Sequence, residues 1–260
     1  MTVHKLARNS RLIMFLLFLA ACAPASCTSP QFELTEPVLV PTDNLVHGTA
    51  SFEVLLGSHV YNTAGNLGAT FPLGTAKSGR FYFYADMLTW IQNPGHSQFR
   101  PRRIVYTLEP GYYIQRDDDR YRFFIKHQSF HNSDTFCEDN ESYEIYGLSY
   151  DSLRNPELHF AIGKYVNRCV VDYSWDIVGW ATWELAQSES TTTYFHAWLH
   201  LVTEANGPRG RNGFTDYAAE LGLRFNSGVM LFARYEFLHD VDCFAGESDH
   251  RLIPGITYTW

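Results

Sequence analysis

Residues 217–237, YAAELGLRFNSGVMLFARYEF, decide the fold of this chain. On both sides of the tripeptide 226–228, apolar or aromatic residues occupy every second position, and small or charged residues fill most of the positions between them. A period of two indicates β-strands, because successive side chains of a strand point to opposite faces. The short break between the two runs predicts a tight hairpin whose strands each have one apolar face.

The same alternation recurs along most of the sequence and predicts about twelve strands. They lie near 51–60, 65–73, 79–90, 102–114, 120–129, 142–151, 157–167, 170–185, 191–204, 213–226, 229–239 and 250–260. Several have ten residues or more, whereas strands of soluble sheets usually have about five or six. Strands of that length can cross a bilayer at a tilt.

The connections between these strands alternate in length along the chain. Short polar connections occur at 116–119, 154–156 and 226–228, and longer ones near 91–101, 130–141, 205–212 and 240–249. Short turns at one end and long loops at the other are typical of outer-membrane barrels. We therefore predict an all-β fold, a single antiparallel transmembrane β-barrel of about 12 strands over residues 51–260. A secreted or lipid-anchored β-sandwich is the alternative.

The composition agrees with this fold and excludes two other classes of protein. Aromatic residues make up 16% of the 260 residues and charged residues 18%, a composition too apolar for a disordered chain. The formal net charge of -8 offers no basic surplus for phosphates, so we expect no nucleic acid partner. An apolar outer wall averaged with a polar lumen accounts for the modest mean hydropathy.

The N-terminal segment predicts export from the cytoplasm. Basic residues followed by an apolar run give residues 1–21 the pattern of a secretory signal peptide. The run ends in Leu-Ala-Ala before Cys22, the form of a bacterial lipobox, so Cys22 is a candidate for lipidation. Cleavage at the Ala-Pro-Ala of 23–25 is the alternative. Residues 22–50 are rich in Pro, Ser and Thr and predict a tether.

Cys137, Cys169 and Cys243 fall in or near the predicted external loops. A disulfide between Cys137 and Cys169 would join the loops that follow the fifth and seventh strands, and unpaired thiols are the alternative. The sequence contains no C-x-x-C motif, so the cysteines indicate no zinc site.

The last predicted strand carries a family resemblance. Apolar residues alternate from Leu252 to Trp260, and the chain ends on an aromatic residue. This pattern resembles the C-terminal strand of bacterial outer-membrane β-barrel proteins, from which only Pro254 departs. The resemblance implies the outer membrane of a diderm bacterium, outer-membrane lipids as surroundings, and recognition of Trp260 by the barrel-assembly machinery.

The segment 123–134, FFIKHQSFHNSD, contains the candidate catalytic residues. His127 and Ser129 are two apart on a strand, so both side chains continue the face of Tyr121, which is expected to face lipid. A serine nucleophile needs a base and a third polar group that orients the imidazole. Asn140 or Glu141, after the following loop, could serve that third role.

This His-x-Ser pair, with a polar residue about a dozen positions later, resembles outer-membrane phospholipase A and lipid A deacylase. Those families place the pair on the lipid-facing wall. The resemblance implies an acyl hydrolase with Ser129 as nucleophile and His127 as base, and calcium as cofactor if the enzyme is phospholipase-like. Both families usually follow the serine with Asn, whereas this chain has Phe130.

Simpler interpretations of the polar residues stay open. His127 and Ser129 also suit interfacial polar residues at the outer rim, and a metal site of His127, His131 and Asp134 is an alternative that we do not assign. His196 and His200 share the lumen face, about 13 Å apart and too far to chelate one ion. Charged residues on that face predict an internal salt-bridge network first and a pore lining second. They are Asp172, Asp176, Glu184, Glu220, Arg224, Arg234 and Glu236.

Five tryptophans predict an aromatic girdle or wall rather than a ligand platform. They are Trp175, Trp180, Trp183, Trp198 and Trp260. Taken together, the sequence favours an outer-membrane barrel with a non-enzymatic structural or surface role. The alternatives are a lipid acyl hydrolase using Ser129 and His127, and a small-solute channel. We expect no cofactor apart from calcium in the case of a phospholipase-like hydrolase.

Overall fold

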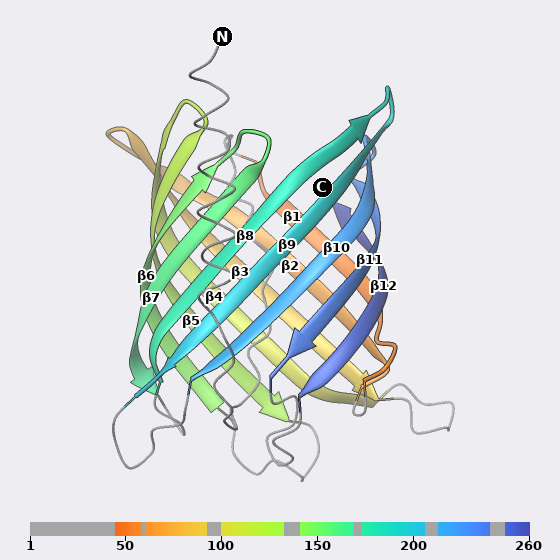
Figure 1. Ribbon diagram of the computed structural model, residues 1–260. Coiled ribbons are helices and arrows are strands. Elements are labelled where there is room, and N and C mark those ends of the chain that lie inside the picture. Colours follow the sequence, from red (N-terminus) through yellow and green to blue (C-terminus); the bar gives the residue numbers. More distant parts are fainter. Residues whose placement is uncertain are drawn as a thin grey trace, which may run out of the picture.

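The computed structural model describes seven segments of the chain, which together form one closed barrel (Figure 1). These segments are 45–58, 61–92, 100–132, 141–168, 173–205, 213–239 and 248–260. The strands are β1 (His47–Val54), β2 (Thr63–Ala76), β3 (Gly79–Gln92), β4 (Arg100–Arg116), β5 (Asp119–Asn132), β6 (Glu141–Ser152), β7 (Glu157–Arg168), β8 (Tyr173–Gln187), β9 (Thr191–Glu204), β10 (Phe214–Phe225), β11 (Val229–Leu238) and β12 (Asp249–Thr259). No helix among these residues is long and apolar enough to cross a membrane.

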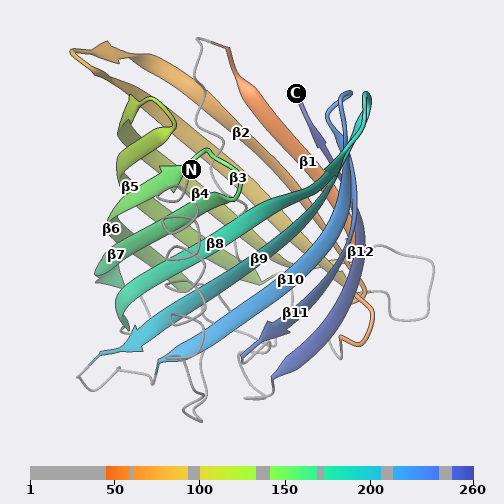
Figure 2. The same ribbon diagram turned by 45° about the horizontal axis from the view of Figure 1, so that its top comes forward.

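Each strand pairs antiparallel with its neighbour in sequence, and β1 closes the ring against β12 (Figures 1 and 2). At this seam the backbone N–H of Gly48 donates to the carbonyl of Trp260, and the N–H of Trp260 donates to the carbonyl of Gly48, both at 3.0 Å. A closed sheet has no edge strand, so it suits a lipid environment in which free backbone groups cannot bond to water. The predicted antiparallel barrel of 12 strands is confirmed.

The strand faces separate as the alternation predicts. Outward positions carry exposed large apolar side chains, including Leu67, Phe81, Phe123, Leu148, Phe160, Leu221, Leu231 and Ile256. Inward positions carry buried polar and charged side chains, including Asp86, Arg122, Gln128, Asp151, Asp176, His200, Glu220 and Arg251. A wall that is apolar outside and polar inside is what a bilayer around a barrel requires.

The short connections gather at one end of the barrel, together with the C-terminal residue Trp260 (Figure 1). They are 77–78, 117–118, 153–156, 188–190 and 226–228. Gly228 has a φ of 87°, which the tight turn before β11 requires. We call this the short-turn end and the opposite one the long-connection end.

Two details of the strands differ from the sequence-based expectation. β1 begins at His47, within the segment predicted as a tether, because β2 extends far enough to pair Thr70 with His47. Pro254 lies inside β12, where it pairs with Ala233 of β11. Proline has no N–H to donate, and the continuous β1–β12 pairing ends at Gly255 and resumes only at Leu252, whose backbone exchanges two hydrogen bonds with Leu56.

Buried aromatic rings fill the lumen near the long-connection end. Phe130, Tyr143, Tyr165, Tyr173 and Phe214 pack with neighbouring ring centroids 5.6 to 6.0 Å apart, and we call these five residues the aromatic plug. A second buried cluster, from Leu55 to Ile253, lies beside it and includes Tyr61, Trp90 and Trp198. The Arg103 guanidinium bridges the two, 4.7 Å from the Phe130 ring and 6.0 Å from the Trp90 ring.

Candidate functional site

The predicted catalytic pair lies on the outer face of β5, close to the long-connection end. Lys126, Gln128 and Phe130 point into the lumen, so the alternating positions of His127 and Ser129 point outward. Tyr121 and Phe123 on the same face are exposed to the surroundings of the barrel. The two side chains therefore lie on the wall that faces lipid.

Ser129 lies between two imidazoles on this face. The Nε2 atom of His131 is 3.3 Å from the Ser129 Oγ, and the His131 ring packs edge-on against Tyr106 with centroids 5.4 Å apart. His127 lies two residues from Ser129 on its other side. The serine thus has one histidine in contact and a second on the same face, two residues away.

The register of β6 brings a carboxylate to this cluster. His127 pairs with Glu144, and Ser129 pairs with Ser142. Tyr143 and Ile145 are buried inside the barrel, so Glu144 and Ser142 share the outer face with Ser129. Side chains that are directly opposite in an antiparallel pair have Cβ atoms about 4.5–5.5 Å apart, which is within reach of a hydrogen bond.

Sequence reasoning did not find Glu144. It proposed Asn140, which lies outside the described residues, and Glu141, whose backbone pairs with Phe130 and whose side chain also lies outside the described part. The role of these two residues stays a prediction. A count of residues after Ser129 cannot locate its cross-strand neighbour, because the intervening connection has no fixed length. Pairing the hairpin from its apolar faces would have pointed to Ser142 and Glu144.

Other predicted site residues lie outside the described segments. These are Cys22, the disulfide candidates Cys137 and Cys169, and Asp134 of the alternative metal site. Within the described part of the chain, no group of three or more His, Cys, Asp or Glu side chains is arranged to hold a metal ion.

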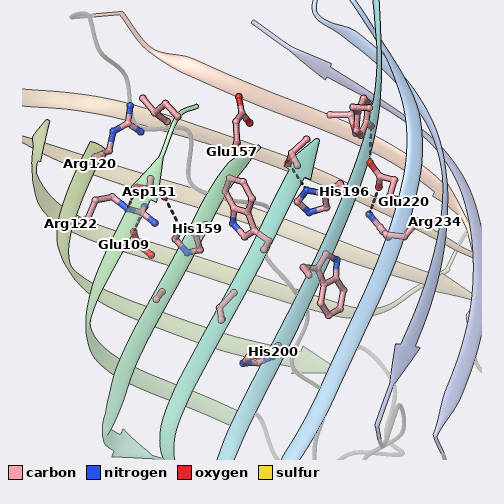
Figure 3. A pocket seen from close by; sticks show the side chains of 18 of the residues that line it. Glu109, Arg120, Arg122, Asp151, Glu157, His159, His196, His200, Glu220 and Arg234 are labelled. Carbon is pink, nitrogen blue, oxygen red and sulfur yellow. Dashed lines mark hydrogen bonds and ion pairs between the residues drawn. The ribbon is translucent and has the colours of Figure 1, made fainter. Parts of the chain in front are cut away.

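A second polar region lies inside the barrel, where a cavity of about 400 Å³ extends from the short-turn end toward the aromatic plug. On one side Arg122 contacts Glu109, with Nη1 3.6 Å from Oε1, and its Nε donates to the Ser149 Oγ at 2.7 Å. Asp151 lies 3.5 Å from the same Nε and is bonded to the Nδ1 of His159 at 2.6 Å (Figure 3). These buried groups come from four neighbouring strands, β4 to β7.

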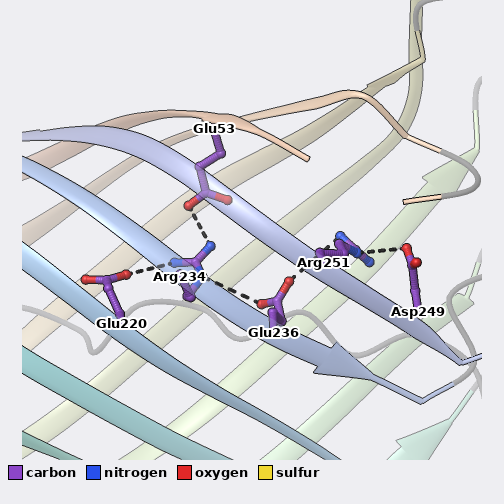
Figure 4. Close-up of polar contacts among 6 residues, drawn as sticks. All are labelled: Glu53, Glu220, Arg234, Glu236, Asp249 and Arg251. Carbon is purple, nitrogen blue, oxygen red and sulfur yellow. Dashed lines mark hydrogen bonds and ion pairs between the residues drawn. The ribbon is translucent and has the colours of Figure 1, made fainter. Parts of the chain in front are cut away.

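Ion pairs on the opposite side of the cavity centre on Arg234 (Figure 4). Its Nη2 lies 2.7 Å from Glu53, its Nη1 3.4 Å from Glu220 and its Nε 3.9 Å from Glu236. Arg251 extends the chain of charges, 3.9 Å from Glu236 and 3.0 Å from Asp249. The internal salt-bridge network predicted from Glu220, Arg234 and Glu236 is present.

The floor of the cavity is a third ionic group. The Lys126 Nζ lies 2.9 Å from one Asp176 oxygen, and the His200 Nε2 lies 2.6 Å from the other. The His200 ring packs edge-on against Phe214 of the plug, with centroids 5.7 Å apart. The polar cavity therefore ends where the aromatic plug begins.

Two tryptophans differ from their predicted positions. Trp180 and Trp198 line the cavity instead of the outer girdle. Trp180 lies between two imidazoles, stacked on His159 at a centroid distance of 5.2 Å and tilted against His196 at 5.5 Å. Strand parity could have shown this, since Trp198 alternates with outward residues between His196 and His200. Glu184 keeps the predicted lumenal parity, opposite Tyr194, and is exposed near the short-turn end of β8.

No family model and no curated protein sequence matches this chain. Solved outer-membrane barrels do match its fold. Outer membrane phospholipase A of Escherichia coli, in an active-site mutant form with an asparagine replaced by alanine, matches with a TM-score of 0.55 at 8% identity, over 87% of this chain and 94% of that chain. The NanC porin matches with a TM-score of 0.49 at 14% identity, over 81% and 98%. OmpF of Salmonella typhi matches with a TM-score of 0.44 at 9% identity, over 83% and 97%.

At these identities the likeness shows the fold alone. The closed antiparallel ring of 12 strands, the apolar outer wall and the polar lumen define the class of protein. The chain is an outer-membrane β-barrel protein of a diderm bacterium, and its outer wall is surrounded by membrane lipid.

Proposed function

We propose that the protein is a membrane-embedded lipid acyl hydrolase with Ser129 as its nucleophile. The observation that carries this proposal is the grouping of a serine, two imidazoles and a carboxylate on one patch of the outer wall. Polar side chains are unfavourable on a lipid-facing wall, so a chemical role accounts for their presence better than packing does. Outer membrane phospholipase A, which has the same barrel architecture, has an asparagine in its active site.

In the proposed mechanism, His127 removes the hydroxyl proton as the Ser129 oxygen attacks the carbonyl carbon of an acyl ester. The imidazolium then donates this proton to the leaving alcohol as the ester bond breaks, and an acyl-serine remains. Water, deprotonated by the same imidazole, releases the fatty acid. Glu144 orients His127 and stabilises its positive charge. His127 is the better base because it has a carboxylate opposite, whereas His131 packs against Tyr106.

Calcium is implied by the phospholipase resemblance but enters no step of this mechanism. Around Ser129 the described side chains offer the Ser142 hydroxyl and the Glu144 carboxylate as oxygen ligands. These supply fewer oxygens than the six to eight or so that Ca²⁺ usually takes. The Ser142 hydroxyl, directly opposite Ser129, is instead the candidate donor to the oxyanion of the tetrahedral intermediate.

The proposal is tested with refolded protein assayed for fatty-acid release from phospholipid and from lipopolysaccharide. We expect Ser129→Ala and His127→Ala to lower kcat on the order of 10³-fold or more, because members of a triad act as a unit. We expect His131→Ala to lower it less than about tenfold. Equal release by the wild type and Ser129→Ala, or no release from either lipid, would contradict the proposal.

The two other functional hypotheses are a small-solute channel and a non-enzymatic surface role. The aromatic plug argues against a small-solute channel, because its packed rings occupy the lumen near the long-connection end. A non-enzymatic surface role would act through connections that lie outside the described residues. That role becomes the leading hypothesis if neither lipid is hydrolysed.

A further inference from the structure

The lumenal cavity is accessible from the short-turn end. Its lining includes Leu153, Glu157 and Thr259, which lie at or next to the short turns. Toward the other end the lining stops at Gln128 and His200, and the aromatic plug lies beyond them. In the described part of the barrel, a small molecule can therefore reach the cavity only through the short-turn end.

Arg120 lies at the mouth of this cavity and has an unused hydrogen-bond donor (Figure 3). Its side chain is only 7% exposed, and its guanidinium lies 5.3 Å from the centre of the Tyr113 ring. Its Nη2 donates a long bond of 3.4 Å to Gln115, and its Nε has no hydrogen-bond partner among the described residues. No described carboxylate forms a direct ion pair with it. A buried guanidinium donor without an acceptor is unfavourable.

Arg122 presents a second unused donor beside it. The two arginines are two residues apart on β5 and point into the lumen together. The Nη1 of Arg122 has no hydrogen-bond partner in the described part of the chain, and the nearest Glu109 oxygen is 3.6 Å away. Glu109 and Asp151 supply two negative charges for the two arginines, but both form their ion pairs with Arg122, so the Arg120 guanidinium has no direct carboxylate contact among the described residues.

We propose that the cavity binds a small hydroxylated molecule with one carboxylate or phosphate group, and that Arg120 and Arg122 hold this anionic group. Guanidinium groups match the planar, bidentate geometry of both anions. The inference is independent of the hydrolase proposal, since the two sites lie on opposite faces of the wall.

The rest of the cavity suits the hydroxylated part of such a molecule. His159 uses its Nδ1 for Asp151, and His196 uses its Nδ1 for the Thr182 hydroxyl at 2.8 Å. Their Nε2 atoms make no further hydrogen bond within the described residues and flank Trp180, which also lines the cavity. A volume of about 400 Å³ falls within the range of small-molecule sites. Glu157 at the mouth would select against ligands with several negative charges.

The test is a titration of refolded protein in detergent micelles, followed by calorimetry and by tryptophan fluorescence. The probes are glucuronate, glucose 1-phosphate and uncharged glucose. We expect saturable binding of one or both anions and none of glucose, and the two anionic probes distinguish a carboxylate from a phosphate ligand. Arg120→Gln should weaken binding at least tenfold. Arg154→Gln is the matched control, because Arg154 is 49% exposed in a turn and pairs with Asp118 at 3.0 Å; it should bind as the wild type does.

Failure of the wild type to bind either anion saturably would overturn the proposal. Unchanged binding by an Arg120→Gln variant with native heat-modifiable gel mobility would also overturn it. If that variant does not refold, Arg120→Lys replaces it, since lysine keeps the positive charge but lacks the bidentate donor geometry of the guanidinium. We then expect Arg120→Lys to bind the anionic probe several-fold more weakly than the wild type does. Equal binding would refute bidentate binding of the anion by the Arg120 guanidinium.

Discussion

At the scale of single residues, the surroundings of the two histidines beside Ser129 differ. His131 contacts the serine oxygen and packs on Tyr106, whereas His127 faces a carboxylate across the hairpin. An imidazole that accepts a proton during a reaction is stabilised by a carboxylate on its other nitrogen. The orienting residue is therefore the feature that separates the two candidates for the base.

Glu144→Ala should lower kcat for fatty-acid release about 100-fold, because His127 loses the group that orients it and stabilises its charge. Glu141→Ala is the matched comparison, since Glu141 pairs with Phe130 and not with His127. It should leave kcat within about threefold of the wild type. Loss of activity in Glu141→Ala alone would show that the register argument is wrong and that the residue proposed from the sequence is correct.

The sequence predicted the positions of His127 and Ser129 because parity within one strand is fixed by the backbone. It could not predict Glu144, since a cross-strand neighbour depends on how many residues the connection 133–140 consumes. It also assigned Trp180 and Trp198 by composition instead of parity, and both assignments were wrong.

At the scale of strands, aromatic rings in the lumen cover glycines of the neighbouring strand. Phe124 lies over Gly147, Tyr194 over Gly222 and Phe232 over Gly255. A Cβ at any of these glycines would overlap the ring that covers it. Such pairs fix the register and permit the curvature that a closing sheet needs.

Gly147→Ala should therefore lower the free energy of unfolding by roughly 1–3 kcal/mol, because the Phe124 ring must leave its preferred position. The matched control is Gly65→Ala, whose new Cβ would meet only the Ser51 carbonyl oxygen at an ordinary 3.5 Å. Urea unfolding of both variants in lipid vesicles measures the difference. Equal stability of the two variants would contradict the role assigned to the Phe124 ring.

The sequence predicted the number of strands and most of their bounds, because alternation persists wherever one face meets lipid. The exception was β1, whose start depends on the length of its partner β2 and not on its own composition. Pro254 likewise could be explained only once the interruption of the β1–β12 pairing between Gly255 and Leu252 was known.

At the scale of the whole molecule, the aromatic plug and the polar cavity occupy different parts of the lumen. The second buried cluster contacts both parts, since its Trp198 and Phe232 also line the cavity. Neither part was predictable in detail, because lumenal side chains meet partners from strands far apart in sequence.

The wild-type protein should accordingly show no steady conductance in planar bilayers. The variant Tyr165→Ala with Tyr173→Ala removes two rings of the plug and should open measurable single-channel steps. Tyr112→Ala with Tyr258→Ala, two tyrosines outside the plug, controls for the loss of aromatic residues and should stay silent. Steady conductance of the wild type would restore the channel hypothesis.

The ion pair between Arg234 and Glu53, which are 181 residues apart in sequence, joins β11 to β1 across the intervening β12. Neither group can meet the other until the first and last strands have paired, so an open sheet leaves Glu53 without this counter-charge. The ion pair therefore adds its stabilisation only to the closed ring. Closure of the ring is thus the step at which Glu53 gains its counter-charge from Arg234.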